Sequence, residues 1–310
     1  MMSKIVEIFE VGPRDGLQNE PVFIALADKI ALTEALARTG LPRIECASFV
    51  SPKWVPQMVD CAAVVTGTTP GLAELYALAP NTRGLQDALQ TPVQGICVFI
   101  AATEGFSRAN TNISLAGAVE RVQALITEFK NNTSGAIKLR GYISCVTECP
   151  YDGAVDPSEV ARLAEMLHRA GCDEVSLGDT IGTAHPEQVS KMLEAVVQVV
   201  PADLLAGHYH DTAGRALENI DVSLEYGLRI FDASIAGLGG CPYAPGAKGN
   251  VDTEKIYDHL IAQGYDILGT PDRGALADVA QLARKTVGRQ GTQLDTVHSE
   301  TDERGAVPFG

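Results

Sequence analysis

Two histidines separated by one residue, His208 and His210, are the most informative chemical feature of this sequence. They follow the apolar run 202–206, which predicts a short buried strand, and a helical pattern starts at Ala213. Side chains on a strand alternate between its faces, so both imidazoles should point one way and Tyr209 the other. Two imidazoles on one face of a strand end form half of a metal site, although a single histidine is more often a core or surface residue. The remaining ligands must come from elsewhere in the chain.

The composition is that of an ordinary globular chain with an acidic balance. Of 310 residues, 45% are hydrophobic and 20% are charged, and the formal net charge is −15. This length allows one or two domains, and single-domain α/β barrels have this size. The negative charge argues against a nucleic-acid or anionic-membrane partner. No stretch approaches the roughly 18 apolar residues of a membrane span.

The cysteine pattern predicts a reduced, cytoplasmic protein. Seven cysteines are scattered, mostly inside apolar runs, and none has the paired spacing of a zinc finger. The first residues enter an apolar strand at once, so we expect no signal or transit peptide. These features are typical of a protein from a reducing compartment.

Short apolar runs alternate with longer helical patterns along most of the chain. The predicted strands are 6–11, 43–46, 75–79, 95–101, 140–145, 174–178, 204–210 and 230–235. The predicted helices are 24–39, 115–129, 157–170, 186–200, 213–226 and 253–263, with an extra one at 272–287. Eight strands that alternate with helices predict an α/β fold, a (β/α)8 TIM barrel in one domain over 1–290. The third unit is the least regular, because 52–70 fits no pattern, and the acidic tail 291–310 is expected to be mobile.

The first predicted strand runs into a loop that contains Arg14 and Asp15. A charged pair in a loop is usually solvated surface, but a barrel places catalysis at the C-terminal ends of its strands. A carboxylate beside two neutral imidazoles suits Mg²⁺ or Mn²⁺ if oxygen ligands complete an octahedron, and zinc if they do not. Arg14 beside such an ion could stabilise an oxyanion or bind a carboxylate.

Other polar residues fall near predicted strands, and each has an ordinary explanation. Glu45 ends strand two and Ser48 follows it, Arg140 opens strand five, and Ser176 and Asp179 close strand six. Singly, each is better explained as a structural ion pair or a helix cap. Several such groups at one end of a barrel favour a functional site instead.

The segment 236–250, after strand eight, contains five glycines and two prolines and predicts an irregular loop. It could be a phosphate cradle or a plain surface loop. The alternative is a lid that carries the Cys241 thiol over an active site to deliver or accept a proton. Asn250, at the end of the loop, offers an amide oxygen as a fourth metal ligand.

Four motifs in this chain resemble the 3-hydroxy-3-methylglutaryl-CoA lyase family. They are the stretches 12–20 (GPRDGLQNE), 48–58 (SFVSPKWVPQM), 176–182 (SLGDTIG) and 237–244 (GLGGCPYA). The resemblance runs in order from about residue 6 to 263, and the loop motif with its cysteine is the most specific part. It implies cleavage of a 3-hydroxyacyl-CoA to acetyl-CoA and acetoacetate on a divalent-metal barrel, and a homodimer.

The same resemblance assigns roles to individual residues. Matches to the family's metal ligands are Asp15, His208, His210 and Asn250. Arg14 matches the catalytic arginine, Asp179 the base for the tertiary hydroxyl with His208 able to assist, and Cys241 the thiol that protonates the departing carbon. The supporting or substrate-binding positions are Gln18, Glu45, Ser48, Arg140 and Ser176.

Some positions depart from the family pattern and leave the acyl substrate open. Tyr209 stands where many members have cysteine, and Pro245 and Lys248 lie in the predicted lid. The last twenty residues contain no cysteine, so we expect no C-terminal regulatory thiol of the kind that some members have. The alternatives are a lyase for a related thioester such as citramalyl-CoA and a synthase running the condensation. A non-catalytic metal- or acyl-CoA-binding barrel would be expected to lack Arg14, Asp179 or Cys241.

Overall fold

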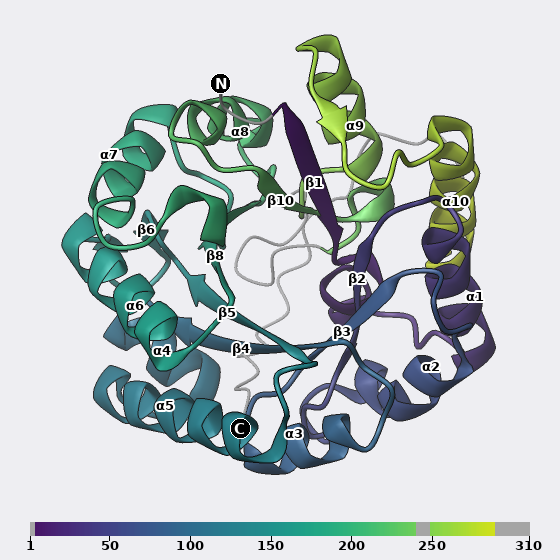
Figure 1. Cartoon of the computed structure of the whole chain (residues 1–310), viewed down its shortest axis with the longest axis horizontal. Coiled ribbons are helices and arrows are strands. Elements are labelled where there is room, and N and C mark those ends of the chain that lie inside the picture. The colour runs from purple at the N-terminus through teal and green to yellow at the C-terminus, as the bar shows by residue number, and fades with distance from the viewer. Residues whose placement is uncertain (1–3, 240–248, 289–310) are drawn as a thin grey trace, which may run out of the picture.

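Eight parallel strands close into a barrel in the computed structural model, which describes residues 4–239 and 249–288 (Figure 1). The strands in chain order are β1 Ile5–Glu10, β2 Arg43–Ser48, β3 Glu74–Leu78, β4 Gly95–Ala101, β5 Lys138–Ser144, β8 Glu174–Asp179, β9 Leu205–Tyr209 and β10 Ile230–Ala233. Each strand pairs with the next, and β10 pairs with β1 to close the ring. The predicted (β/α)8 fold is therefore confirmed.

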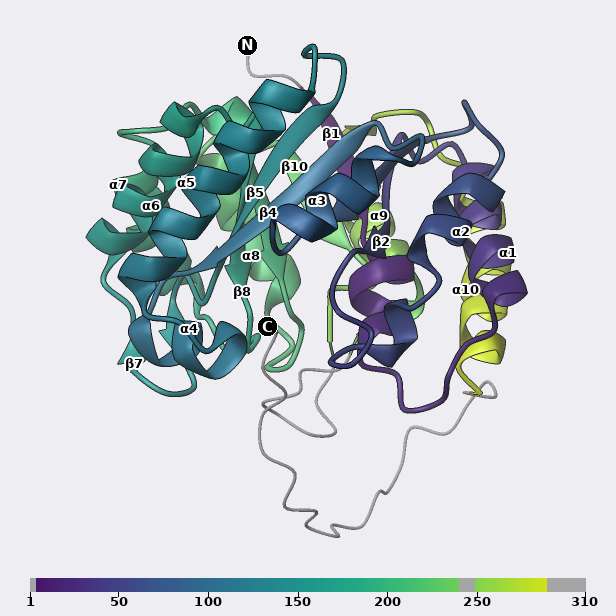
Figure 2. The ribbon, with the colours of Figure 1, turned by 90° about the horizontal axis from the view of Figure 1, so that it is seen from below.

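Helices surround the barrel, as Figure 1 shows from one end and Figure 2 from the side. They are α1 Leu26–Ala37, α2 Cys61–Gly67, α3 Thr82–Leu89, α4 Glu104–Thr111, α5 Leu115–Asn132, α6 Pro157–Ala170, α7 Pro186–Val196, α8 Ala216–Glu225, α9 Thr253–Ala262 and α10 Arg273–Thr286. Local sequence explains several boundaries. The Asp156 carboxylate accepts from the Ser158 amide just before Pro157, and α6 ends at Gly171 with a φ of 112°. The extra helix predicted at 272–287 is α10, which packs against α1.

A few short elements depart from the predicted pattern. The irregular stretch 52–70 contains a 3-10 turn, Pro56–Met58, and the seven-residue helix α2. Residues Ala202–Leu204 form a 3-10 turn and do not begin β9 as predicted. The strands β6 Glu148–Cys149 and β7 Gly153–Ala154 form a small hairpin, and β11 Asp266–Ile267 extends the sheet beside β1. These pieces are too short for a sequence period to reveal.

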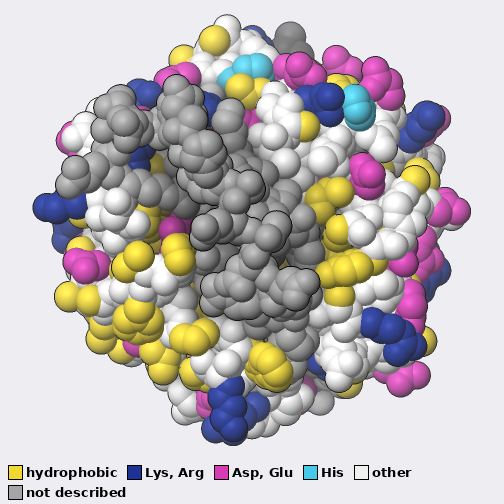
Figure 3. Space-filling view, turned by 180° about the vertical axis from the view of Figure 1, so that it is seen from behind, with side chains coloured by type: hydrophobic (Ala, Val, Ile, Leu, Met, Phe, Trp, Pro, Cys, Tyr) yellow, Lys and Arg dark blue, Asp and Glu magenta, His cyan; other side chains and the backbone are white. Residues whose placement is uncertain are grey.

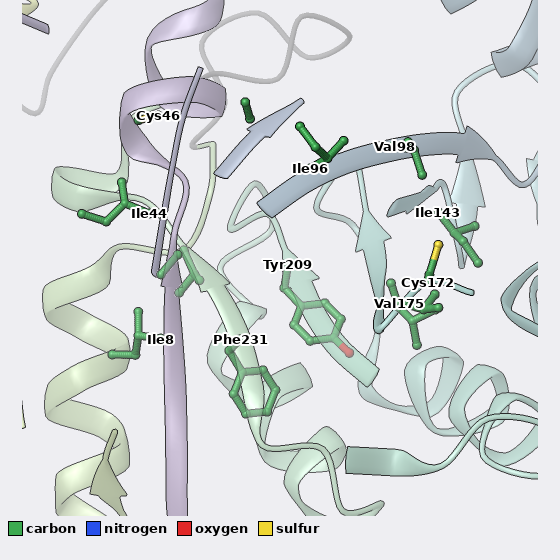
Figure 4. Close-up of a cluster of buried hydrophobic side chains, with 14 of the residues drawn as sticks. Ile8, Ile44, Cys46, Ile96, Val98, Ile143, Cys172, Val175, Tyr209 and Phe231 are labelled. Carbon is green, nitrogen blue, oxygen red and sulfur yellow. The ribbon is translucent and has the colours of Figure 1, made fainter. Parts of the chain in front are cut away.

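The main hydrophobic core lies between the strands and the surrounding helices. Figure 4 shows strand residues such as Ile8, Ile44 and Val175 within this cluster. The opposite face of the strands points into the barrel, where Phe9 and Tyr76 pack edge to face with ring centroids 5.1 Å apart. This alternation is what strands buried on both faces require. It places polar side chains of the inner face where they can meet one another.

Two further observations concern the limits of the described chain. Within the described residues, no helix is long and apolar enough to cross a membrane. Cys241, Pro245, Lys248 and the predicted tail 291–310 lie outside the described residues.

Candidate functional site

Asp15, His208 and His210 come together at the C-terminal end of the barrel. Asp15 lies in the turn after β1, His208 on β9 and His210 just beyond it, and their ligand atoms lie within 4.8 Å of one another. His210 Nε2 is 3.9 Å from Asp15 Oδ2. Tyr209 points the other way into the core, where its hydroxyl bonds the Ser223 hydroxyl at 2.7 Å. The predicted alternation along this strand is confirmed.

The turn that presents Asp15 is held by close backbone packing. Residues Gly12–Gly16 form a π-type turn, in which the Val11 carbonyl accepts from the amides of Arg14, Asp15 and Gly16. A Cβ on Gly16 would lie 2.7 Å from Ser234 Oγ and 2.8 Å from Leu238 Cβ. Glycine is therefore needed at this position because the backbone approaches its neighbours too closely for a side chain.

Glu10 ties this turn to the end of β10. Its carboxylate accepts from the Gly12 and Ile235 amides, both at 2.8 Å, and from the Thr253 hydroxyl at 2.6 Å. Complete burial raises the pKa of Glu10 to about 7, against the three hydrogen bonds that favour the charged form. The residue thus joins both loops that border the site, and sequence analysis did not single it out.

The protonation states of the cluster suit a metal ion. Burial opposes ionisation of Asp15, but Arg14 and then the two imidazoles outweigh burial and hold its pKa below the ordinary value. Burial, and then His208, lowers the pKa of His210 to about 4, so its imidazole is neutral at physiological pH. His210 Nδ1 is buried without a hydrogen-bond partner among the described residues. An ionised carboxylate, the neutral imidazole of His210 and the imidazole of His208 together fit the ligand set of a divalent cation.

Asn250 lies beside Asp15 as predicted for a fourth ligand. Its Nδ2 donates to Asp15 Oδ2 at 2.8 Å and to the Leu238 carbonyl at 3.3 Å. Its amide oxygen would have to turn toward the carboxylate to join a metal's ligands. Asn250 is within reach of the cluster, and the orientation of its side-chain amide determines whether its oxygen can bind a metal.

Behind His208 stands a buried carboxylate that the sequence reading missed, Asp232 on β10. His208 Nδ1 is 2.9 Å from Asp232 Oδ2, and the same oxygen accepts from Ser176 Oγ at 3.0 Å. Arg140 donates to both oxygens of Asp232, at 2.5 and 3.0 Å. The signal was present in the sequence, because a carboxylate in the middle of a buried strand needs a partner. Arg140 and Ser176 therefore lie inside the barrel, one layer below the strand ends where we had expected them.

Arg14 is clamped between two acids and lines the cavity. Its Nη1 is 2.5 Å from Asp15 Oδ1, and its Nε and Nη2 are 2.7 and 2.6 Å from Glu45 Oε2. Burial disfavours the charged guanidinium, but Glu45 and then Asp15 outweigh burial and raise the pKa of Arg14 above its ordinary value. Glu45 is the third residue of β2 and does not end the strand, which corrects the sequence reading. It still reaches the site because its side chain points into the barrel.

The buried charge network contains more carboxylates than guanidinium groups. Hydrogen bonds and ion pairs connect its members from Glu7 at the N-terminal end of the barrel to Asp15 at the C-terminal end. The sequence alone does not reveal these contacts. Its charged members are Glu7, Arg43, Glu174, Arg140, Asp232, Glu45, Arg14 and Asp15. Five carboxylates face three guanidinium groups, which leaves two negative charges when the histidines are neutral. One of them belongs to the group of Glu45, Arg14 and Asp15, where a divalent cation would be favoured.

A cavity of about 140 Å³ opens beside the cluster. One side is apolar, with Leu78, Phe99, Phe106 and Ile143, and the other is polar and includes Arg14, Gln18, Asn110, Thr180 and both histidines. Gln18 Oε1 is buried without a hydrogen-bond partner among the described residues. The volume is below the roughly 300–1,000 Å³ of sites that enclose a drug-sized ligand. It therefore suits a small group and not a large ligand as a whole.

Asp179 and Ser48 are buried close by, but neither belongs to the cavity lining within the described chain. The Asp179 carboxylate accepts from the Ala184 amide at 3.1 Å and lies 3.5 Å from the Thr147 hydroxyl. Burial raises the pKa of Asp179 to about 6, against these hydrogen bonds. Its neighbours Gly178 and Thr180 line the cavity instead. Ser48 Oγ has no hydrogen-bond partner among the described residues.

The fold and the site together define a class: a (β/α)8 barrel with a two-histidine, one-carboxylate cluster at the C-terminal ends of its strands. A sequence model of the family described as HMGL-like matches residues 5–283. The chain therefore belongs to the HMGL-like family, and the resemblance noted in the sequence is confirmed.

Individual relatives cover nearly the whole chain. A Pseudomonas aeruginosa protein named 3-hydroxy-3-isohexenylglutaryl-CoA/hydroxy-methylglutaryl-CoA lyase is 47% identical over 93% of this chain and 95% of its own. The HMG-CoA lyase structure from Brucella melitensis has a TM-score of 0.88 and 49% identity, and the match covers 92% of this chain and 99% of that one. The structure of an HMG-CoA lyase from Acinetobacter baumannii in complex with coenzyme A and 3-methylmalate has a TM-score of 0.86 and 30% identity, covering 97% and 99%.

Proposed function

We propose that this protein is a divalent-metal-dependent lyase that cleaves 3-hydroxy-3-methylglutaryl-CoA to acetyl-CoA and acetoacetate. The observation that carries the proposal is the convergence of Asp15, His208, His210 and Arg14 on one cavity. The names of relatives that match over nine tenths of the chain support the same substrate. Mg²⁺ and Mn²⁺, the two ions proposed from the sequence, both suit this ligand set.

The proposed reaction breaks the bond between C2 and C3 of the acyl group. The C3 hydroxyl loses its proton, the C3–O bond becomes a ketone, and the electron pair of the broken bond moves into the enolate of acetyl-CoA. A proton delivered to C2 then completes acetyl-CoA. When bound at Asp15, His208 and His210, the divalent ion would supply a lower pKa for the C3 hydroxyl.

Arg14 is the residue that we assign to the enolate oxygen. A guanidinium has five N–H groups, and contacts with Asp15 and Glu45 use Nε and one on each terminal nitrogen. Two N–H groups remain to meet a substrate oxygen in the cavity. Because Glu45 and Asp15 already fix the guanidinium, no reorganisation is needed when charge develops on that oxygen.

Proton transfer at the two reacting carbons is assigned to Asp179 and Cys241. A carboxyl pKa of about 6 makes Asp179 a better base near neutral pH than an ordinary aspartate. Its hydrogen bonds to the Ala184 amide and the Thr147 hydroxyl mean that it must turn, or act through an intervening group, to reach the hydroxyl. His208 is a weaker candidate, because Nδ1 faces Asp232 and only Nε2 is left, either for the ion or for a proton. Cys241 keeps the role of proton donor to C2, on the sequence resemblance.

Supporting roles follow from the contacts of the remaining residues. Gln18 lines the cavity with an oxygen that has no partner in the described part of the chain, and Glu45 fixes Arg14. Arg140 and Ser176 act through Asp232 and not on the substrate. Ser48 and Asn250 are close to the strand ends, and we assign Asn250 to the metal.

The cavity itself supports an acyl-CoA as the substrate. The apolar side formed by Leu78, Phe99, Phe106 and Ile143 is suited to the methyl group on C3. The small volume leaves the nucleotide part of the thioester outside the barrel. The Acinetobacter relative was solved in complex with coenzyme A and 3-methylmalate, which supports a coenzyme A thioester as the class of ligand.

We propose that the protein acts as a homodimer in the cytoplasm, without a nucleic-acid or membrane partner. Four large hydrophobic side chains, Val22, Phe23, Trp54 and Val59, are each more than two fifths exposed. Gln57 joins the two segments that carry them, because its side chain bonds the Val22 carbonyl and the Ile24 amide, both at 2.9 Å. Figure 3 shows hydrophobic side chains gathered along part of one face, as a subunit contact requires. The six cysteines in the described residues are free, which supports a reducing compartment.

The decisive experiment is a panel of 3-hydroxyacyl-CoA thioesters assayed for released acetyl-CoA. We expect 3-hydroxy-3-methylglutaryl-CoA to give the highest kcat/KM. Citramalyl-CoA should be poorer, because it lacks the carbon that separates the carboxylate from C3. A preference for citramalyl-CoA would change the substrate, and no acetyl-CoA from any thioester would refute the lyase.

A further inference from the structure

We infer that Asp232 is the positioning residue of the metal site: it holds the His208 imidazole in the tautomer and orientation that direct Nε2 toward Asp15. This inference rests on the proposed function in one respect, because the test by metal affinity requires that the protein binds a divalent metal. Its geometric part stands on contacts within the barrel.

Asp232 is fixed more firmly than an ordinary ion-pair partner. It is 1% exposed, and Arg140, with which it pairs, is also 1% exposed. Its Oδ2 accepts from Ser176 Oγ and Arg140 Nη1, both at 3.0 Å, and faces His208 Nδ1 at 2.9 Å. Arg140 Nη2 fixes the other oxygen at 2.5 Å. A carboxylate held at both oxygens cannot turn away from the imidazole.

That arrangement determines which nitrogen of His208 carries the proton. An ionised carboxylate only accepts hydrogen bonds, so His208 Nδ1 is the donor, and in the neutral imidazole Nε2 then carries the lone pair. Metal ligands need such a lone pair, and a carboxylate on the other nitrogen makes the imidazole a stronger ligand. His208 thus meets the requirement before any ion binds.

The ring is also held from a second side. Tyr142 contacts His208 edge to face, with ring centroids 6.0 Å apart and planes at 83°. The Tyr142 hydroxyl accepts from Arg140 Nη1 at 2.6 Å. Arg140 therefore places both neighbours of the ring, although it does not touch the ring through any described hydrogen bond. His210 has no such support, because its Nδ1 is unpaired among the described residues.

A purely structural role would make Asp232 equivalent to Glu174, the other acid on Arg140. Glu174 bonds Arg140 Nε and is 3.0 Å from Arg43 Nη2, but it has no described contact with either histidine. Glu174→Gln is therefore the matched control, since it removes a carboxylate of similar burial from the same arginine. The two substitutions should cost similar stability and differ at the metal.

The first measurement is Mn²⁺ binding to the purified full chain without substrate, by titration calorimetry or by the EPR signal of free Mn²⁺. We expect Asp232→Ala and Asp232→Asn to weaken Mn²⁺ binding about 10- to 100-fold. Glu174→Gln should stay within about twofold of the wild type. Ser176→Ala, a milder change that keeps the charges, should weaken binding about two- to tenfold by loosening Oδ2. If thermal melting shows that the Asp232 variants do not fold, Ser176→Ala replaces them in this measurement.

The second measurement needs no metal and separates this inference from the proposed function. Long-range ¹H–¹⁵N NMR of the metal-free protein reports the tautomer of each histidine. We expect the Nδ1–H tautomer for His208 in the wild type and in Glu174→Gln, and a shift toward Nε2–H in Asp232→Ala. An Nε2–H tautomer in the wild type, or Mn²⁺ binding by Asp232→Ala equal to that of the wild type, would overturn the inference. A wild type that binds no Mn²⁺ would count against the proposed function, and the tautomer would then decide the inference alone.

Discussion

The two ends of the barrel both contain buried charged side chains, but they differ in how completely the polar atoms there are hydrogen-bonded. At the N-terminal end, Arg43 bonds Glu7 and Glu174, and Arg140 also bonds Glu174. At the C-terminal end, buried polar atoms lack partners among the described residues, namely Gln18 Oε1, Glu45 Oε1, Ser48 Oγ and His210 Nδ1. The cavity at the N-terminal end is nevertheless the larger, at about 460 Å³ against about 140 Å³.

The difference shows that size does not identify the functional end of this barrel. A buried polar atom without a partner costs free energy, so a protein that keeps several at one place is organised for a ligand. The charged side chains at the other end bond one another and support the fold. Four predictions test this contrast, from the largest expected effect to the smallest.

Removing divalent metal should abolish turnover. A chelator followed by gel filtration is expected to lower acetyl-CoA formation by at least about 10³-fold, because the ion is needed for ionisation of the C3 hydroxyl. Added Mg²⁺ or Mn²⁺ should restore the rate. Thermal melting in parallel should show a smaller change, since the N-terminal ion pairs do not depend on the ion. Full activity in the metal-free protein would contradict the assignment of the C-terminal end.

Asp179→Asn should lower kcat/KM by about 10²–10⁴-fold if Asp179 is the base. A base must be ionised, and its pKa is about 6, so wild-type kcat/KM should fall as the pH drops through 6 and level off above it. The Asn variant should lose this acidic limb. Glu174→Gln, at the paired end, should keep it. A small loss of kcat/KM with an unchanged pH profile would mean that Asp179 is not the base and only holds the turn at Ala184.

Arg14→Gln and Arg43→Gln compare one arginine from each end. Arg14→Gln should lower kcat by about 10²–10³-fold, because it removes the N–H groups assigned to the enolate oxygen. Arg43→Gln leaves Glu7 without its arginine and Glu174 with Arg140 alone, and should cost about 3–5 kcal/mol of unfolding free energy, with kcat per folded molecule nearly unchanged. The measurements are steady-state kinetics and urea unfolding of each variant. Equal kinetic losses from both would remove the distinction between the two ends.

Glu10→Gln should give the smallest effect, visible in stability. The folded-state pKa of Glu10 is raised to about 7 from 4.5, so the stabilising contribution of the protonated carboxyl is complete below pH 4.5. It is lost as the pH rises through 7. The variant should therefore be more stable than the wild type by about 1–3 kcal/mol at pH 8, and nearly equal at pH 4.5. Denaturant unfolding at the two pH values tests this, and a variant that is less stable at pH 8 would show that the hydrogen bonds of the charged form dominate.

The fold was predictable because its signal is repeated along the chain. Pro157 after Asp156 and Gly171 gave the bounds of α6 within the sequence itself. The short pieces were not predictable, because α2 spans seven residues and the hairpin strands β6 and β7 span two each. Such lengths carry less than two turns or one alternation, so neighbouring structure decides them.

Part of the site was also readable from local sequence. His208 and His210 follow from strand alternation, and Asp15 follows from its place after the first strand. Asp232 was overlooked because an acid inside an apolar run shows only that some partner exists, and the partner Arg140 is 92 residues away. Ser176 and Arg140 were expected at the strand ends, but the inner face of the barrel sets their depth. The orientation of the Asp179 carboxylate likewise depends on the turn at Ala184.

The sequence by itself determined the eight strands, the residue types of the metal cluster and the face on which the two imidazoles lie. These follow from short-range periodicity, which acts over a few residues. Only the tertiary structure decided that Asp15 meets the histidines, that Asp232 and Arg140 stand behind His208, and that five carboxylates share one buried network with three guanidinium groups. Closure of the barrel brings residues together across hundreds of positions, and no local pattern records which charges will then share a low-dielectric interior.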